Sequence, residues 1–127
     1  MKSLILTAIA IVIAAASWGP ARAATIVVTN NADSGAGSLR QAILTANATA
    51  GVPDLIQFNI IGPGPFTTTP LTPLPAITDP LVLDGYSQSG ASTNTQATGD
   101  NAILQIVIPG QLLIDTSNTT VRGLSIR

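Results

Sequence analysis

The sequence contains neither cysteine nor histidine, and after Lys2 it contains no further lysine. Without these side chains the chain cannot form a disulfide, a zinc site built from Cys and His, a cysteine nucleophile or a Ser–His–Asp triad. Residues 24–127 carry six Asp against Arg40, Arg122 and Arg127, a formal charge of −3. That balance excludes a basic nucleic-acid surface, because phosphate binding needs clustered Lys and Arg.

The first 23 residues predict a cleavable secretory signal peptide. A positively charged start is followed by the apolar run Leu4–Ala16, a Gly-Pro break and Ala21–Ala23, which begins and ends with a small residue. The 13-residue run is shorter than the roughly 20 residues of a membrane-spanning helix, although an uncleaved anchor remains the alternative. We predict cleavage between Ala23 and Ala24, and a product that is secreted or held at the cell surface or outer membrane.

Residues 24–62 predict a mixed segment of strand, helix and strand. The β-branched run 25–29 and the run 55–61 are typical of strands. Between them, a helix is expected over Ser38–Asn47, with Ser38 and Gln41 at the spacing of a capping box. Its apolar residues fall at i, i+3, i+4 and i+7 and form one stripe, namely Leu39, Ala42, Ile43 and Ala46. So short a helix must pack on an apolar surface to be stable.

The remainder predicts a Pro-rich connector over residues 63–80 and then a series of short strands over 81–127. Strands are expected at 81–86, 103–108, 112–115 and 121–126. The apolar residues Ile56, Leu81, Ile103 and Leu124 follow one another at steps of 25, 22 and 21 residues. Such near-regular spacing is typical of a coiled β-solenoid, in which each turn buries its apolar side chains against the next. The alternative is an antiparallel β-sandwich, whose strands would recur every 8–12 residues or so.

The segment Asp33–Ile43 (DSGAGSLRQAI) resembles the opening of bacterial right-handed parallel β-helix proteins of the CSLREA type. The resemblance continues through residues 54–59, 74–80, 83–86 and 118–126 and so covers nearly all of residues 24–127. This resemblance implies a mainly β, pectin-lyase-like fold, a right-handed parallel β-helix with one short capping helix. Residues 24–62 would form the N-terminal cap and 81–127 the first rungs. In such proteins many more rungs follow, so we expect the chain to be a truncated fragment of a longer repeat protein. Two departures are Gly37 in the approximate place of the motif's Cys, and Gln41 in place of its Glu.

Three carboxylates, Asp79, Asp84 and Asp115, lie near the ends of predicted strands. They could contribute to a Ca²⁺ site or to an acid and base pair, but calcium needs six to eight converging oxygens and hydrolysis needs two facing carboxyls. Asp also stabilises turns through bonds to its own backbone. We therefore predict no catalytic, cofactor or metal site here, with Ca²⁺ binding as the alternative.

The arginines have structural explanations. Arg40, on the predicted helix, is expected to pair with Asp33 or Asp54, or to donate to loop carbonyls. Arg122 is expected to point outward from a strand. With no Lys, and with Arg122 and Arg127 as the only arginines on the late predicted strands, residues 24–127 lack a convincing basic and acidic set for a polysaccharide lyase.

Three functions are compatible with these observations. The first is an exported structural or adhesive surface module whose partners are cell-surface glycans or proteins of a host or neighbouring cell. Phe66 and Tyr86 are its aromatic candidates for stacking on a sugar. The second is the N-terminal part of a carbohydrate-active enzyme, a polysaccharide lyase or glycoside hydrolase, with its active site beyond Arg127. A nonfunctional remnant or stand-alone binding module is the third. No nucleic acid and no membrane span after cleavage are expected.

Overall fold

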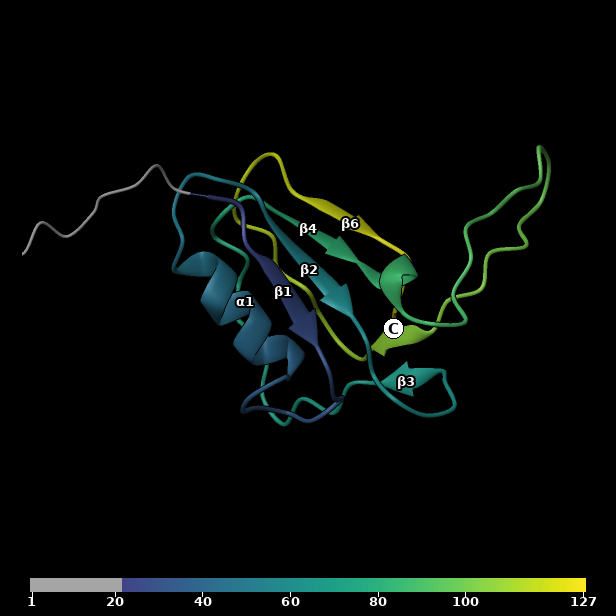
Figure 1. The fold of residues 1–127 in the computed structure, drawn as a ribbon, viewed down its shortest axis with the longest axis horizontal. Helices are drawn as coiled ribbons and strands as arrows, with labels where there is room; N and C mark the ends of the chain where they lie inside the picture. Colours follow the sequence, from purple (N-terminus) through teal and green to yellow (C-terminus); the bar gives the residue numbers. More distant parts are fainter. Residues whose placement is uncertain (1–21) are drawn as a thin grey trace, which may run out of the picture.

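The computed structural model describes residues 22–127 (Figure 1). The predicted signal peptide, residues 1–23, therefore lies almost entirely outside the described residues. The elements follow in the order β1 (Thr25–Val28), α1 (Leu39–Asn47), β2 (Asp54–Phe58), β3 (Phe66–Thr67), β4 (Leu81–Asp84), the 3₁₀ turn η1 (Gly85–Ser87), β5 (Ile106–Ile108), β6 (Thr120–Arg122) and β7 (Leu124–Ile126).

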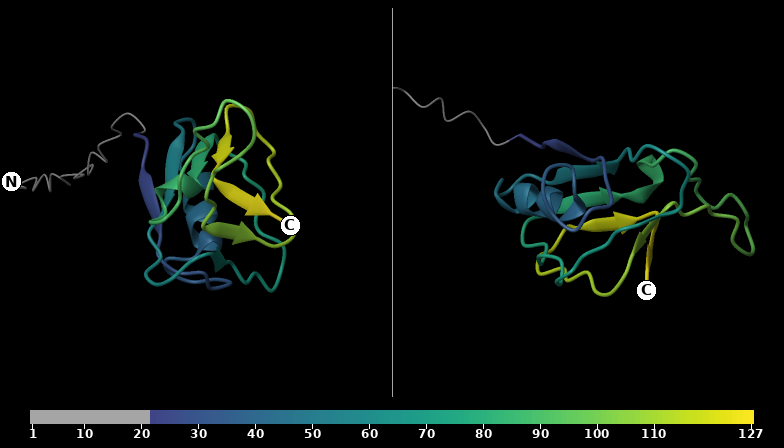
Figure 2. Two further views of the ribbon diagram at one scale, coloured as in Figure 1. Left: turned by 90° about the vertical axis from the view of Figure 1, so that its right-hand side faces the viewer. Right: turned by 90° about the horizontal axis from the view of Figure 1, so that it is seen from below.

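The strands form two parallel sheets. The first sheet has the order β1-β2-β4-β6 and the second has the order β3-β5-β7. Figure 2 shows the second sheet facing the first across the interior, with α1 beside β1 and β2. Because neighbouring parallel strands need a crossover connection, each strand is joined to its neighbour by a long segment, which between β1 and β2 contains α1.

The prediction of a mainly β, right-handed parallel β-helix is wrong for residues 22–127. They form a small α/β structure of two parallel sheets with short strands and one α-helix, and neither sheet closes or forms a solenoid. The antiparallel sandwich is not formed either, since all named strand pairs are parallel.

The regular step behind that prediction does not exist in the strand register. Ile26, Ile56, Leu83 and Val121 are the residues that pair across the first sheet, at steps of 30, 27 and 38 residues. Ile103 lies outside both sheets in an isolated antiparallel bridge with Ser92. The four residues that the sequence analysis took as equivalent therefore lie in different parts of the structure. Similar spacing along the chain does not mean that the residues stack on one another in space.

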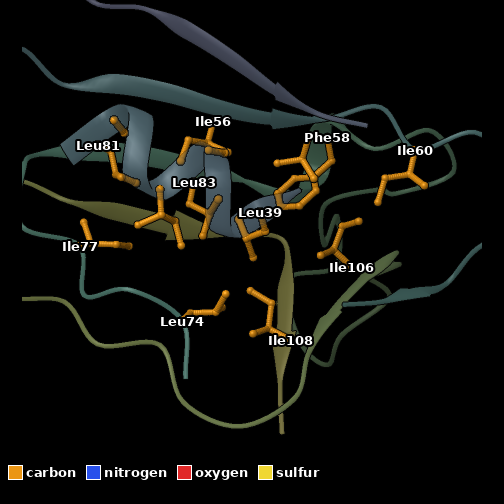
Figure 3. Close-up of a cluster of buried hydrophobic side chains, with 14 residues drawn as sticks. Leu39, Ile56, Phe58, Ile60, Leu74, Ile77, Leu81, Leu83, Ile106 and Ile108 are labelled. Atoms are coloured by element: carbon orange, nitrogen blue, oxygen red, sulfur yellow. The ribbon is translucent and has the colours of Figure 1, made fainter. Parts of the chain in front are cut away.

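The hydrophobic core lies between the two sheets and helix α1 (Figure 3). The helix contributes the four residues of its predicted stripe, all buried. Strand side chains that alternate toward the interior contribute most of the rest, among them Ile56, Phe58, Leu83, Ile106 and Ile108. The connector before β4 adds Leu74 and Ile77, so it packs as part of the core.

Several predicted strands differ in length from the observed ones. The connector 63–80 contains β3, an edge strand of the second sheet that directly follows Pro65. Edge strands tolerate neighbouring proline, because their outer N–H groups need no partner strand. The predicted strand 112–115 is reduced to one bridge, between Ile114 and Ile77.

Among residues 22–127 no helix combines the length and apolar character that a membrane crossing requires.

Candidate functional site

Arg40 fastens the turn before α1 to the Pro-rich connector. Its guanidinium lies 3.0 Å from the Asp33 carboxylate and donates to the carbonyl oxygens of Asp33, Thr72 and Pro73 at 2.8–3.0 Å. Asp33 also accepts from the Leu71 backbone N–H at 2.8 Å. The Leu71 N–H first, and then Arg40, hold the pKa of the Asp33 carboxyl below its ordinary value. Of the two predicted partners of Arg40, the structure selects Asp33, and the role of this cluster is structural.

The N-terminus of α1 has a serine cap. Ser38 Oγ accepts from the Gln41 backbone N–H at 3.2 Å and donates to the Gly35 carbonyl at 2.7 Å. The Gln41 side chain turns toward Thr45 Oγ1, at 3.4 Å, so Gln41 does not supply the second bond of the predicted capping box.

A second ion pair joins two neighbouring strands of the first sheet. Asp84, at the end of β4, accepts from Arg122 on β6 at 2.8 Å and from the Tyr86 backbone N–H at 3.1 Å. Asp84 raises the pKa of the Arg122 guanidinium. The Arg122 side chain is 55% exposed, so it extends outward from the strand and pairs at the surface.

The carboxylates that the sequence suggested for metal or acid–base chemistry are used separately. Asp79 Oδ1 accepts from the Gly51 backbone N–H, while Asp84 pairs with Arg122 and Asp115 is exposed. In the described part of the chain no three potential ligand residues gather as a metal site would require. Asp79 keeps one buried carboxylate oxygen, Oδ2, without a hydrogen-bond partner.

The predicted aromatic sugar contacts belong to different elements, and neither side chain is fully exposed. Phe66, on β3, packs against the hydrophobic core, and Tyr86, in η1, is half-buried. A hollow of about 300 Å³ lies between residues 70–74 and 109–111, and its lining is mainly Pro and Leu with no aromatic ring.

Strands β6 and β7 form one open edge of both sheets. Each is the last strand in its sheet, and only Gly123 separates them. Directly after β7, Arg127 donates a backbone hydrogen bond to Ile108 of β5 and accepts one from Gly110, which lies just beyond β5. Because successive residues of a strand direct their backbone groups to alternate sides, Ile126 directs its N–H away from β5.

The most prominent surface feature is the segment 89–105, which we call the projecting loop. It leaves the body between η1 and β5 and extends well beyond both sheets, on the right of Figure 1. Its start is fixed by buried Gln88, whose side-chain amide exchanges two hydrogen bonds of 2.8 and 2.9 Å with the Ile60 backbone. At its base, Ser92 and Ile103 exchange backbone bonds of 3.0 and 2.9 Å.

The tip of the projecting loop is organised by two asparagines. Asn94 Oδ1 accepts from the backbone N–H groups of Gln96 and Asn101, and Asn94 Nδ2 donates to the Gly99 carbonyl at 2.9 Å. Asn101 in turn bonds Thr95 through both its amide oxygen and its amide nitrogen, at 2.8 and 3.0 Å. The loop is thus ordered by polar side chains, without a hydrophobic core of its own. Nothing in the sequence periodicity pointed to it, although its Asn, Thr and Gly content is typical of turns.

No protein-family model matches the chain, and no curated protein or solved structure matches it. The resemblance to CSLREA-type surface proteins is not tested by these comparisons and stays a prediction.

Proposed function

We propose that the chain is an exported adhesive surface module that binds neutral glycans through the projecting loop. The observation that carries this proposal is a 17-residue excursion that is ordered by its own hydrogen bonds while projecting from the body. Loops longer than about 12–15 residues without regular elements are usually functional or disordered, and the internal bonds favour the first alternative.

The chemistry of the loop suits sugar hydroxyls. Residues 92–101 are all exposed, and Asp100 is the one charged residue among them. Thr, Asn, Gln and Ser side chains supply both donors and acceptors, which match hydroxyl groups better than they match phosphates or sulfates. Because the Asn94 and Asn101 bonds hold the backbone in place before binding, little conformational entropy remains to be lost when a glycan docks.

Export supplies the location that such a function needs. The predicted signal peptide would deliver residues 24–127 to the outside of the cell, where glycans of the same or a neighbouring cell are accessible. The low charge of the mature chain, six Asp against three Arg, also disfavours a nucleic-acid or strongly acidic partner.

The test is a glycan array probed with the exported protein and with a loop-shortened variant. In that variant Asn-Gly replaces residues 93–102, because this dipeptide favours a two-residue hairpin turn between the bonded pair Ser92 and Ile103. We expect wild-type protein to be retained on neutral glycans and the shortened variant to lose retention while keeping its urea unfolding midpoint. Asn94→Ala, which keeps the loop but removes its central bonds, should weaken binding about tenfold.

Gln41→Ala is the matched control, because it replaces another exposed amide side chain on helix α1. It should bind like wild type. Equal retention of wild-type and loop-shortened protein would refute the assignment to the loop. Retention on protein ligands alone, with none on glycans, would refute the glycan specificity.

A further inference from the structure

The start of β1 is tied to a fully buried acid. Asp54, the first residue of β2, has 0% exposure, and its Oδ1 accepts from the Ala24 backbone nitrogen at 2.7 Å. Its Oδ2 accepts from the Thr49 hydroxyl. The Ala24 carbonyl accepts from the Leu55 N–H at 2.8 Å, so Ala24 is held through both of its backbone polar groups.

This acid has no cationic partner in the described residues. Residues 22–127 contain two ion pairs, Asp33–Arg40 and Asp84–Arg122, and neither includes Asp54. A buried carboxylate held only by neutral donors is costly, since burial removes its hydration without supplying an opposite charge. A positive charge placed at Ala24 would offset part of this cost through its attraction to the carboxylate.

The predicted cleavage site places a positive charge at that nitrogen. We propose that Asp54 is the binding site for the new N-terminus, an inference that rests on the export step of the proposed function. Hydrolysis of the Ala23–Ala24 peptide bond consumes one water, leaves a carboxylate on Ala23, and leaves Ala24 with an amine that takes up a proton. The Ala24 nitrogen that donated as an amide then donates as an ammonium group, and the hydrogen bond to Asp54 becomes an ion pair. Removal of the signal peptide thus gives the buried Asp54 carboxylate a positively charged partner.

The other charged groups near this position are few. Helix α1 carries only Arg40, which is bound to Asp33 and the connector, and residues 48–53 carry no charge. The segment before β4 supplies Asp79, which binds Gly51 of the same loop that contains Thr49. Among the described residues, Asp54 is the charged group that contacts the Ala24 nitrogen, and its negative charge favours the ammonium form.

The absence of lysine after Lys2 makes this ammonium group easy to measure. In the exported product the α-amino group is the one primary amine, so an N-hydroxysuccinimide ester of acetate acylates it selectively. The full chain is expressed with its own leader in a bacterial host. The intact mass of the exported product is measured first, and should match Ala24–Arg127.

The acylation rate is then measured between pH 6 and 11, for the native product and for the same product in urea. In urea we expect a midpoint near the ordinary α-amino value of about 8, and in the native protein a midpoint at least about one unit higher. At pH 8 the α-amino group of the native protein should react several-fold more slowly than the same group in urea. Asp54→Asn should return the native midpoint toward that of the unfolded chain, and Asp100→Asn, on the projecting loop, should leave it raised.

If Asp54→Asn does not fold, acetylated and free wild-type proteins give the same information. The acetylated product, which cannot become an ammonium, should unfold at a lower urea concentration at pH 6, and the difference should vanish above the raised midpoint. Equal midpoints in native and unfolded wild type, or a mature N-terminus other than Ala24, would overturn the inference. Glycan retention, measured on the same preparation, reports separately on the proposed function.

Discussion

Gly123 occupies the corner between β6 and β7, where the chain passes from the first sheet to the second. Its φ is +69°, a left-handed conformation that side chains disfavour, and the residue is buried. A Cβ at this position would lie 2.5 Å from the Tyr86 backbone nitrogen and 2.9 Å from the Gly85 carbonyl carbon. Both neighbours are backbone atoms of the η1 turn, so they cannot move aside as a flexible side chain would. Gly123→Ala should therefore be strongly destabilising.

Two separate costs contribute to this substitution. The left-handed conformation costs roughly 1–2 kcal/mol for a residue with a Cβ. Overpacking against fixed neighbours adds about 1–3 kcal/mol. Gly110 offers a matched control, because its φ is +90° but no atom lies within 4 Å of the position its Cβ would take. Gly110→Ala should lower the free energy of unfolding through the left-handed conformation alone. Gly123→Ala should lower it through both the conformation and the overpacking, by about 2–5 kcal/mol in total.

Equilibrium urea unfolding of the three proteins measures the difference directly. The midpoint for Gly123→Ala should lie below that for Gly110→Ala by about 1 M, with unchanged slopes. If the two substitutions lower the midpoint equally, the close approach of the chain at Gly85 and Gly123 does not constrain the corner, and the packing argument fails.

Two further outcomes follow from the contacts around α1. Ser38→Ala removes the hydroxyl that accepts from the Gln41 N–H, so it should lower the free energy of unfolding by about 1 kcal/mol; an unchanged urea midpoint would contradict this. The lowered pKa of Asp33 stabilises the folded chain above the ordinary carboxyl value, and this contribution is lost as the pH falls through the folded-state pKa. Asp33→Asn should therefore reduce the acid sensitivity of the thermal midpoint below about pH 4, and a variant with the wild-type acid sensitivity would argue against the assignment.

Local signals in the sequence predicted the helix well. The stripe of Leu39, Ala42, Ile43 and Ala46 matches the four residues that α1 buries, and Ser38 is its N-cap. These features depend on neighbours three or four positions apart, so they can be detected without knowledge of the fold. The strand β4 was likewise predicted from its apolar run, although its end at Asp84 was placed two residues late.

The sheet arrangement could not be obtained in the same way. Leu81 and Leu124 were taken as equivalent positions, yet they belong to different sheets, and Ile103 belongs to neither. Strand register depends on which side chains meet across the core, and the connections that bring them together differ in length and content. Equal steps in sequence therefore carried no information about stacking here.

The candidate sites also combine features that the sequence determines with features that only tertiary packing decides. Composition alone determined that residues 24–127 contain no cysteine, histidine or lysine, which limits their chemistry wherever each side chain lies. The contact between Ala24 and Asp54 joins residues 30 positions apart, and the projecting loop is defined by how far it stands from the sheets. Residue identity and short-range periodicity are properties of the chain itself, whereas burial, pairing and projection exist only after distant segments have packed together.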